Sequence, residues 1–240
     1  MTTTYFTIVS GAAYEQHVSR LQASATRLGI VVHVVRVPQD ASIATIKKQK
    51  PLRMLELAHS SERLVYVDAD TLLVDVSGIE TLSGSLKEPW GMGKVPLTAL
   101  MDTTSETEKR QQQLFDILDR RNLGVFLPGG ELHRQEWNSG VIVGPSDSLK
   151  ALATRWLEWW HILDTIFDGR FRRDQIAYRY AYYEWSRDYP DVFHEPFNWI
   201  CKRRGLCGNP KIYHLAGLQK QPAIQHKYYS KICHQLRWTL

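Results

Sequence analysis

The first 70 residues alternate short apolar runs with segments of helical periodicity. Apolar residues recur at helical spacing until Gly29, and a second helix is predicted to begin at Pro51 and to run through Ala58. This alternation indicates an α/β fold with a parallel sheet and right-handed crossovers. The apolar runs are rich in β-branched residues and predict three strands, Tyr5–Ser10, Val31–Val37 and Leu64–Val67, of which the first and the third are expected to be buried.

The second part of the chain is also periodic, and its elements are longer. Apolar residues at helical spacing predict a long helix that Ser146 caps and that carries Trp156, Trp159 and Trp160 in the core. No internal repeat or linker divides the chain, so a single domain over residues 1–240 is expected. Three further elements are predicted: a polar helix from Ser105 to about Asn122, a strand over Trp137–Val143 and a helix over about Asp174–Tyr189.

The charge is unevenly distributed, although its total is modest. The 240 residues include 30 Lys and Arg against 25 Asp and Glu, a net charge of +5. From Pro196 to Leu240 there are eight basic residues and no acidic one, so the remaining 195 residues carry a net charge of −3. Such a basic end attracts phosphates, anionic lipid head groups or nucleic acid, and an ordinary solvated end is the plainer alternative.

Three features bear on the compartment. No stretch reaches the roughly 18 consecutive apolar residues of a membrane span. The N-terminus MTTTYFTIVSG lacks a basic region before its apolar run, so it indicates a first strand and not a signal peptide. The cysteines Cys201, Cys207 and Cys233 form no disulfide framework. These features favour a cytoplasmic protein, and the cations and aromatic residues after His226 would suit peripheral contact with the inner face of a membrane.

The strongest chemical signal is the pair Asp68 and Asp70, which directly follows the third predicted strand. Ligands of open α/β sheets bind at the carboxyl ends of strands. Two buried carboxylates this close are costly unless a cation lies between them, and Mg²⁺ and Mn²⁺ favour such oxygen ligands. The pair is therefore interpreted as a metal site. The plainer alternative is that both side chains cap the next turn.

In its context this pair resembles the Asp-x-Asp motif of nucleotide-sugar glycosyltransferases with the GT-A fold. The similarity is greatest to glycosyltransferase family 8, which includes glycogenin and bacterial lipopolysaccharide galactosyltransferases. Residues Met101–His133 have no counterpart in that family. Further segments match it in the same order and span nearly the whole chain: Thr7–Gly11 with Tyr14, the basic Arg53, Asn138-Ser-Gly, Asp174-Gln175, and His214, Gly217 and Lys220 in the spacing His-x-x-Gly-x-x-Lys.

The resemblance implies a single-domain GT-A fold, that is, a Rossmann-like, mostly parallel sheet flanked by helices. Residues 1–100 would form the nucleotide-binding half, and residues 101–240 the acceptor side and a C-terminal closing segment. It also implies a retaining hexosyltransferase that uses manganese or magnesium. The donor would be a nucleotide-diphosphate sugar, a UDP-sugar first of all, and the acceptor a saccharide, a lipid-linked glycan or a protein.

The same resemblance assigns a metal and phosphate site. Asp68, Asp70 and His214 would be the metal ligands. Gly217 would let the backbone pass close to the donor phosphates, and Lys220 would bring a positive charge to them. A structural histidine and an exposed lysine are the plainer interpretations of His214 and Lys220.

Other residues are implied to contact the sugar and the nucleotide. Asn138 and Asp174 would bind sugar hydroxyls, and Gln175 would lie beside the anomeric carbon. As alternatives, Asn138 holds a turn, and Asp174 and Gln175 belong to the first turn of a helix. The remaining donor contacts would come from Ser10, Gly11, Tyr14, Arg53 and Ala69.

Three other functions stay open at the level of sequence. A sugar nucleotidyltransferase would carry a Gly-rich, cationic loop after the first strand, where this chain reads Ser-Gly-Ala-Ala-Tyr-Glu. A non-enzymatic nucleic-acid-binding protein would explain the basic end but not Asp68, Asp70 and Asn138, so no nucleic acid partner is expected. A degenerate transferase that only binds nucleotide sugar would not need the full set of motifs.

Overall fold

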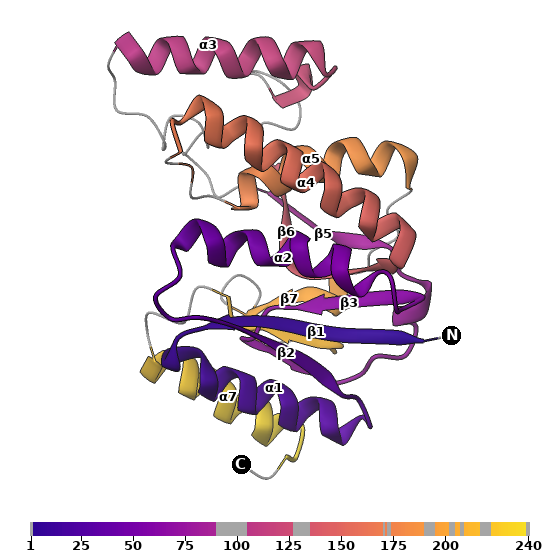
Figure 1. The fold of residues 1–240 in the computed structure, drawn as a ribbon. Coiled ribbons are helices and arrows are strands. Elements are labelled where there is room, and N and C mark those ends of the chain that lie inside the picture. The colour runs from indigo at the N-terminus through magenta and orange to yellow at the C-terminus, as the bar shows by residue number, and fades with distance from the viewer. Residues whose placement is uncertain are drawn as a thin grey trace.

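The protein is built around a five-stranded sheet in the order β2-β1-β3-β6-β5 (Figure 1). The structure, a computed structural model, describes residues 2–89, 105–126, 135–169, 171, 174–189, 195–201, 205–206, 209–216 and 222–238. A smaller sheet has the order β4-β8-β7. The strands are β1 (Thr3–Ser10), β2 (Val32–Val37), β3 (Arg63–Val67), β4 (Thr71–Leu73), β5 (Gly84–Pro89), β6 (Gln135–Pro145), β7 (Trp199–Ile200) and β8 (Ile212–His214).

Helices cover both faces of the larger sheet. In Figure 1, α1 and α7 lie on one side, α2, α4 and α5 lie on the other, and α3 lies beyond α4. The α-helices are α1 (Glu15–Arg27), α2 (Ile43–Leu57), α3 (Ser105–Arg120), α4 (Ser146–Ile166), α5 (Asp174–Asp188) and α7 (Pro222–Gln235). Short 3₁₀ helices are η1 (Ala12–Tyr14), η2 (Ile79–Thr81), η4 (Gly124–Phe126) and η5 (Glu195–Asn198).

The sheet is mixed, so the expectation of a mostly parallel sheet is wrong in part. β1 pairs in parallel with β2 and β3, as the βαβ pattern predicted. β6, however, runs antiparallel to β3 and to β5. A β-α-β crossover forces parallel pairing between the strands that it joins, but the long connection between β3 and β6 leaves their relative direction to tertiary packing. The described residues therefore form an open, mixed α/β sheet.

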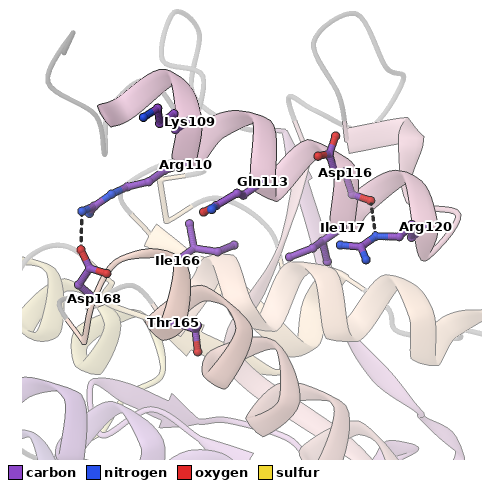
Figure 2. Close-up of a pocket in the computed structure, with 9 residues that line it drawn as sticks. All are labelled: Lys109, Arg110, Gln113, Asp116, Ile117, Arg120, Thr165, Ile166 and Asp168. Atoms are coloured by element: carbon purple, nitrogen blue, oxygen red, sulfur yellow. Dashed lines mark hydrogen bonds and ion pairs between the residues drawn. The ribbon is translucent and has the colours of Figure 1, made fainter. Parts of the chain in front are cut away.

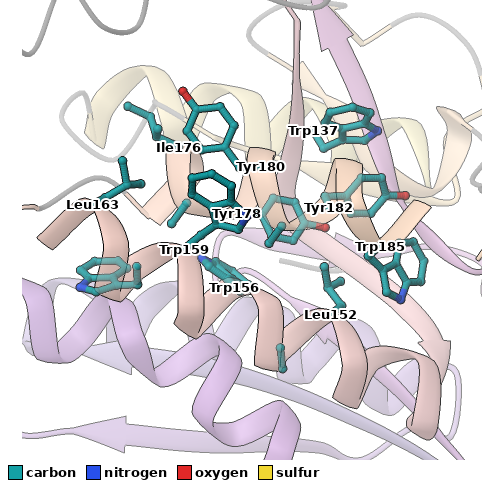
Figure 3. Close-up of a cluster of buried hydrophobic side chains, with 14 of the residues drawn as sticks. Trp137, Leu152, Trp156, Trp159, Leu163, Ile176, Tyr178, Tyr180, Tyr182 and Trp185 are labelled. Carbon is teal, nitrogen blue, oxygen red and sulfur yellow. The ribbon is translucent and has the colours of Figure 1, made fainter. Parts of the chain in front are cut away.

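Alternating side chains of the central strands supply two hydrophobic cores. Phe6 and Tyr66 face α2, α4 and α5, whereas their neighbours Tyr5 and Val65 face α1. The first core is dominated by aromatic rings, and Trp156, Trp159 and Trp160 of α4 are buried there, as predicted. Figure 3 shows several of these rings, from α4, α5 and β6, gathered in one cluster: Trp137, Trp156, Trp159, Tyr178, Tyr180, Tyr182 and Trp185.

The beginnings of two helices differ from prediction. α2 begins at Ile43 and contains Pro51 in its interior, so Pro51 does not start this helix. The earlier start is fixed by Ser42, whose side chain accepts a hydrogen bond from the amide of Thr45. α4 is preceded by Pro145 as N-cap, and Ser146, expected to be the cap, lies in the first turn and makes no capping bond.

Replacing Ser42 by Ala should lower the free energy of unfolding by about 1 kcal/mol, because the amide of Thr45, 3.1 Å from the Ser42 hydroxyl, loses its acceptor. Denaturant unfolding measures the change. Ser19→Ala is the control, since Ser19 is exposed within α1 and its hydroxyl only bonds the carbonyl of Glu15. We expect the control to be neutral or slightly stabilising. An effect of Ser42→Ala no larger than that of the control would contradict a helix start at Ile43.

The C-terminal helix α7 packs against α1 (Figure 1): Gln225 hydrogen-bonds to His17, and the guanidinium of Arg20 lies over the ring of Tyr229. Ile232 and Cys233 of α7 are buried, whereas Lys227 and Lys231 are exposed. The helix is thus an ordinary packed element with a basic outer surface, and its contact with a membrane stays a prediction. Among the described residues, no helix combines the length and the apolar character needed to cross a bilayer.

Candidate metal centre

The Asp68–Asp70 segment is a tight turn between β3 and β4. The amide of Asp68 donates to the carbonyl of Gly140 in β6 at 2.7 Å, and the amide of Leu215 donates to the carbonyl of Asp70 at 2.9 Å. β4 then pairs antiparallel with β8, with Thr71 opposite His214. Because this pairing sets β8 directly beside the turn, it brings His214 to the two aspartates.

The three predicted metal ligands lie together. His214 Nε2 is 3.5 Å from Asp70 Oδ1 and 3.6 Å from Asp68 Oδ2. One ligand atom from each residue lies within 4.8 Å of the others, and the described residues contain no further group of this kind. A magnesium-sized ion bonded at about 2.1 Å in octahedral geometry would hold neighbouring ligand atoms about 3 Å apart. Two carboxylates and one imidazole, nearly at that spacing, fit a divalent cation such as Mn²⁺ or Mg²⁺.

The electrostatics of the site also favour a cation. Burial by itself would lower the pKa of His214, but the interaction of its ring with the carboxylates of Asp68 and Asp70 outweighs burial and raises the pKa to about 9. Burial would likewise raise the pKa of Asp68, but Lys50, followed by His214 and Tyr66, holds it well below its usual range. Asp68 is therefore ionised at neutral pH, and the site attracts positive charge strongly enough to hold a proton on the imidazole.

Two lysines of α2 enter the site, and they were not foreseen. Lys50 Nζ lies 2.9 Å from Asp68 Oδ1 and 4.0 Å from Asp174 Oδ2, and Lys47 Nζ lies 3.0 Å from Asp174 Oδ1. Burial disfavours the charged form of Lys50, but Asp68 and then Asp174 raise its pKa above the ordinary value. The ammonium of Lys50 thus lies between the candidate metal centre and the start of α5.

Arg53, the basic residue of α2 that was expected to contact the donor, binds elsewhere. Its guanidinium binds Glu56 one turn further along α2, and Arg53 is not among the residues that line the cavity at the site. A donor contact by Arg53 therefore has no support in the geometry. Lys47, Lys50 and Arg53 recur at three-residue spacing on one helix, a signal that became readable only with α2 beginning before Pro51.

Asp174 and Gln175 lie at the start of α5, as predicted, but their contacts differ. Asp174 is buried and binds the two lysines. The side-chain amide of Gln175 makes two hydrogen bonds to the backbone of β6. Its nitrogen donates to the carbonyl of Trp137 at 2.9 Å, and its oxygen accepts from the backbone amide of Ser139 at 3.1 Å. The described contacts of Gln175 tie α5 to β6, and its role beside an anomeric carbon stays a prediction.

A cavity of about 350 Å³ opens beside the aspartates. Ser10, Tyr14 and Ala69, three of the predicted donor contacts, line it together with the two aspartates and the two lysines. Gly11 is not among the lining residues, but its positive φ of 84° shapes the turn between Ser10 and Tyr14. Gly217 and Lys220 lie outside the described residues.

A second cavity, of about 500 Å³, lies between α3 and the end of α4 (Figure 2). It is lined by Lys109, Arg110 and Arg120, within the segment without a family counterpart. Figure 2 shows Arg110 reaching across to Asp168, with which it forms an ion pair. None of the predicted site residues lines this cavity, so it is separate from the candidate metal centre.

Gly140 has no side chain, and the imidazole of His214 lies in the space that a Cβ atom at this position would need. A Cβ atom on Gly140 would lie 2.0 Å from Cε1 and 2.7 Å from Nδ1 of the buried His214 imidazole and 2.8 Å from Asn138 Oδ1, so these side chains would have to shift. Gly140→Ala should therefore weaken Mn²⁺ binding by roughly tenfold or more and lower stability by about 1–3 kcal/mol. Isothermal titration with Mn²⁺ and denaturant unfolding measure the two effects.

Gly144→Ala is the matched control on the same strand. Its Cβ would lie 3.2 Å from Leu149 Cδ2 and Cγ and 3.4 Å from Ser148 Oγ, away from the metal ligands. Equal Mn²⁺ affinity in Gly140→Ala and Gly144→Ala would show that the packing of Gly140 on His214 does not matter for the ion.

Neither protein-family models nor curated protein sequences match this chain, so inference about its chemistry depends on the site itself.

Proposed function

We propose that the chain is a metal-dependent, retaining glycosyltransferase that moves a hexose from a nucleotide-diphosphate sugar, with UDP-sugars as first candidates. The observation that carries the proposal is the convergence of Asp68, Asp70 and His214 beside a cavity of about 350 Å³. A divalent ion held by three protein ligands keeps positions for phosphate oxygens, so a diphosphate is a fitting ligand. The acceptor in this proposal is a saccharide, a lipid-linked glycan or a protein.

Each part of the cavity has a task in this proposal. Asp68, Asp70 and His214 would hold a Mn²⁺ or Mg²⁺ ion, which would supply Lewis-acid stabilisation of the charge on the departing nucleotide diphosphate. The ammonium of Lys50 supplies a second positive charge next to Asp68. The half-exposed ring of Tyr14 offers an aromatic face to the nucleotide base.

Retention of configuration is proposed to follow from front-face attack. In that step the acceptor oxygen bonds to the anomeric carbon while the bond to the donor phosphate breaks, and the acceptor proton passes to the leaving phosphate oxygen. The state of Asp174 supports this route over a covalent intermediate, because a carboxylate already bound by Lys47 and Lys50 is a poor nucleophile. A product with inverted anomeric configuration would contradict it.

A panel of nucleotide sugars tests the proposal directly. The purified protein is scored for thermal stabilisation and for donor hydrolysis with UDP-, GDP- and ADP-sugars, each with Mn²⁺ and with a chelator. We expect at least one donor to stabilise the protein and to be hydrolysed only in the presence of the ion. The absence of a metal-dependent response to every donor would contradict the proposal. Salt-dependent binding of DNA would then favour the nucleic-acid-binding alternative.

A further inference from the structure

Two asparagines connect the imidazole of His214 to the backbone of β6. Asn198, the last residue of η5, is fully buried, and its Oδ1 lies 2.9 Å from His214 Nδ1. Its Nδ2 donates to Asn138 Oδ1 at 3.0 Å. Asn138 Oδ1 also accepts from the amide of Gly140 at 2.8 Å. The chain of bonds thus runs from β6 through two side-chain amides to the face of His214 opposite the aspartates.

The backbone N–H of Gly140 determines the direction of each of these three hydrogen bonds. A backbone N–H can only donate, so the atom of Asn138 that meets Gly140 is the oxygen. The atom of Asn198 that meets the same oxygen must then be its NH₂ group, which turns the Asn198 oxygen toward His214. An amide oxygen only accepts, so the proton of this bond belongs to His214 Nδ1.

We infer that Asn198 is a positioning residue for the metal: it fixes the Nδ1–H tautomer of His214 and so presents Nε2 to the ion, and Asn138 orients Asn198. The inference rests on the proposed metal centre. It gives Asn138 a second task beside the expected contact with a sugar hydroxyl, which stays a prediction: its oxygen accepts hydrogen bonds from Gly140 and Asn198. The Nε2 atom is also the one that faces Asp68 and Asp70.

The chemistry of the partner suits this centre. Histidine ligands of metals commonly donate their other N–H to a carboxylate or a carbonyl oxygen, which sets the ring orientation. Here the acceptor is a neutral amide, so a buried site that already holds Asp68 and Asp70 gains no third negative charge. A purely structural role would need the hydrogen bonds but would not depend on which imidazole nitrogen carries the proton.

The tautomer can be observed in the unaltered protein. Long-range ¹H–¹⁵N correlation spectra of ¹⁵N-histidine-labelled protein with saturating Mg²⁺ report which ring nitrogen of each histidine is protonated, and the signal absent from His214→Gln identifies His214. We expect His214 to carry its proton on Nδ1. A proton on Nε2, with Nδ1 bare, would overturn the inference whatever any variant does.

Titration with Mn²⁺ alone, without nucleotide, tests whether Asn198 contributes to the affinity for the ion. Asn198→Ala should weaken Mn²⁺ binding by roughly 10- to 100-fold, because the imidazole loses the acceptor that holds it. Asn198→Asp keeps an oxygen facing Nδ1–H, but it loses the NH₂ group that donates to Asn138 and adds a buried negative charge. We therefore expect it to be less stable than the wild type and yet to bind Mn²⁺ more tightly than Asn198→Ala does. A general loss of packing would instead lower stability and Mn²⁺ affinity together in both variants.

Gln225→Ala is the matched control. Gln225 is a buried amide on α7 that also bonds an imidazole, that of His17 at 3.1 Å, but it contacts no predicted metal ligand. Its loss should lower stability and leave Mn²⁺ affinity unchanged. Folded Asn198→Ala protein with the affinity of the wild type would overturn the positioning role alone, whereas wild-type protein that binds no divalent ion would overturn the metal centre and the proposed function with it.

Discussion

Replacing Asp70 by Asn should abolish Mn²⁺-dependent stabilisation by nucleotide sugar and lower the rate of donor hydrolysis on the order of 100-fold or more. Asn keeps the shape of the side chain but removes its charge, and a neutral amide oxygen is a weaker ligand for a hard cation. Asp70 is 4% exposed, so water does not readily replace the lost ligand. A loss of this size corresponds to the several kcal/mol that a catalytic metal supplies to charge stabilisation.

Asp75→Asn provides the matched control for this prediction. Asp75 follows β4 in the same segment, but its carboxylate binds Ser77 and Lys211 at the surface and does not line the cavity. The control should keep the response of the wild type to Mn²⁺ and donor. If Asp70→Asn behaved like Asp75→Asn in both assays, the catalytic interpretation of the Asp-x-Asp turn would fail.

Replacing Lys50 by Met should lower the stability of the metal-free protein but raise its affinity for Mn²⁺. This opposition makes the substitution a sharp test of the charge balance in the site. The free energy of unfolding measured with a chelator should fall by about 3 kcal/mol, because Asp68 and Asp174 lose a buried ammonium between them. The affinity for Mn²⁺ should rise, because the ion no longer shares Asp68 with a neighbouring positive charge. Donor turnover should fall, because one of the two lysine ammonium groups that line the cavity is gone.

Denaturant unfolding with and without Mn²⁺, together with titration of the ion, measures these effects. Lys48→Met is the control: Lys48 lies on the same helix, and its ammonium lies over the ring of Trp160, 5.4 Å from the centroid, away from the aspartates. Loss of that contact should cost about 0.5–1 kcal/mol and leave Mn²⁺ affinity unchanged. A fall in Mn²⁺ affinity in Lys50→Met would mean that Lys50 supports the ion instead of competing with it.

Local pattern was sufficient for the framework of the protein. The apolar runs predicted β1, β2, β3 and β6. The reason is clearest for β3, whose five residues are all buried, because a strand buried on both faces has to be apolar at nearly every position. The periodicity of α4 predicted that Trp156, Trp159 and Trp160 are buried, because residues three and four apart share one helix face. The position of Asp68 and Asp70 after β3 followed from the end of the apolar run alone.

Tertiary structure decided what the framework brings together. The direction of β6 and the pairing of β4 with β8 depend on contacts between distant segments, and strands of three residues leave no periodicity to detect. The partners of Lys50 and Asn198 were equally hidden, since a polar residue has the same sequence signature whether it faces water or a buried carboxylate. The sequence alone was therefore enough to predict the main buried segments, because burial follows local hydrophobicity. Only folding decided which polar groups meet, because that depends on the geometry of long-range packing.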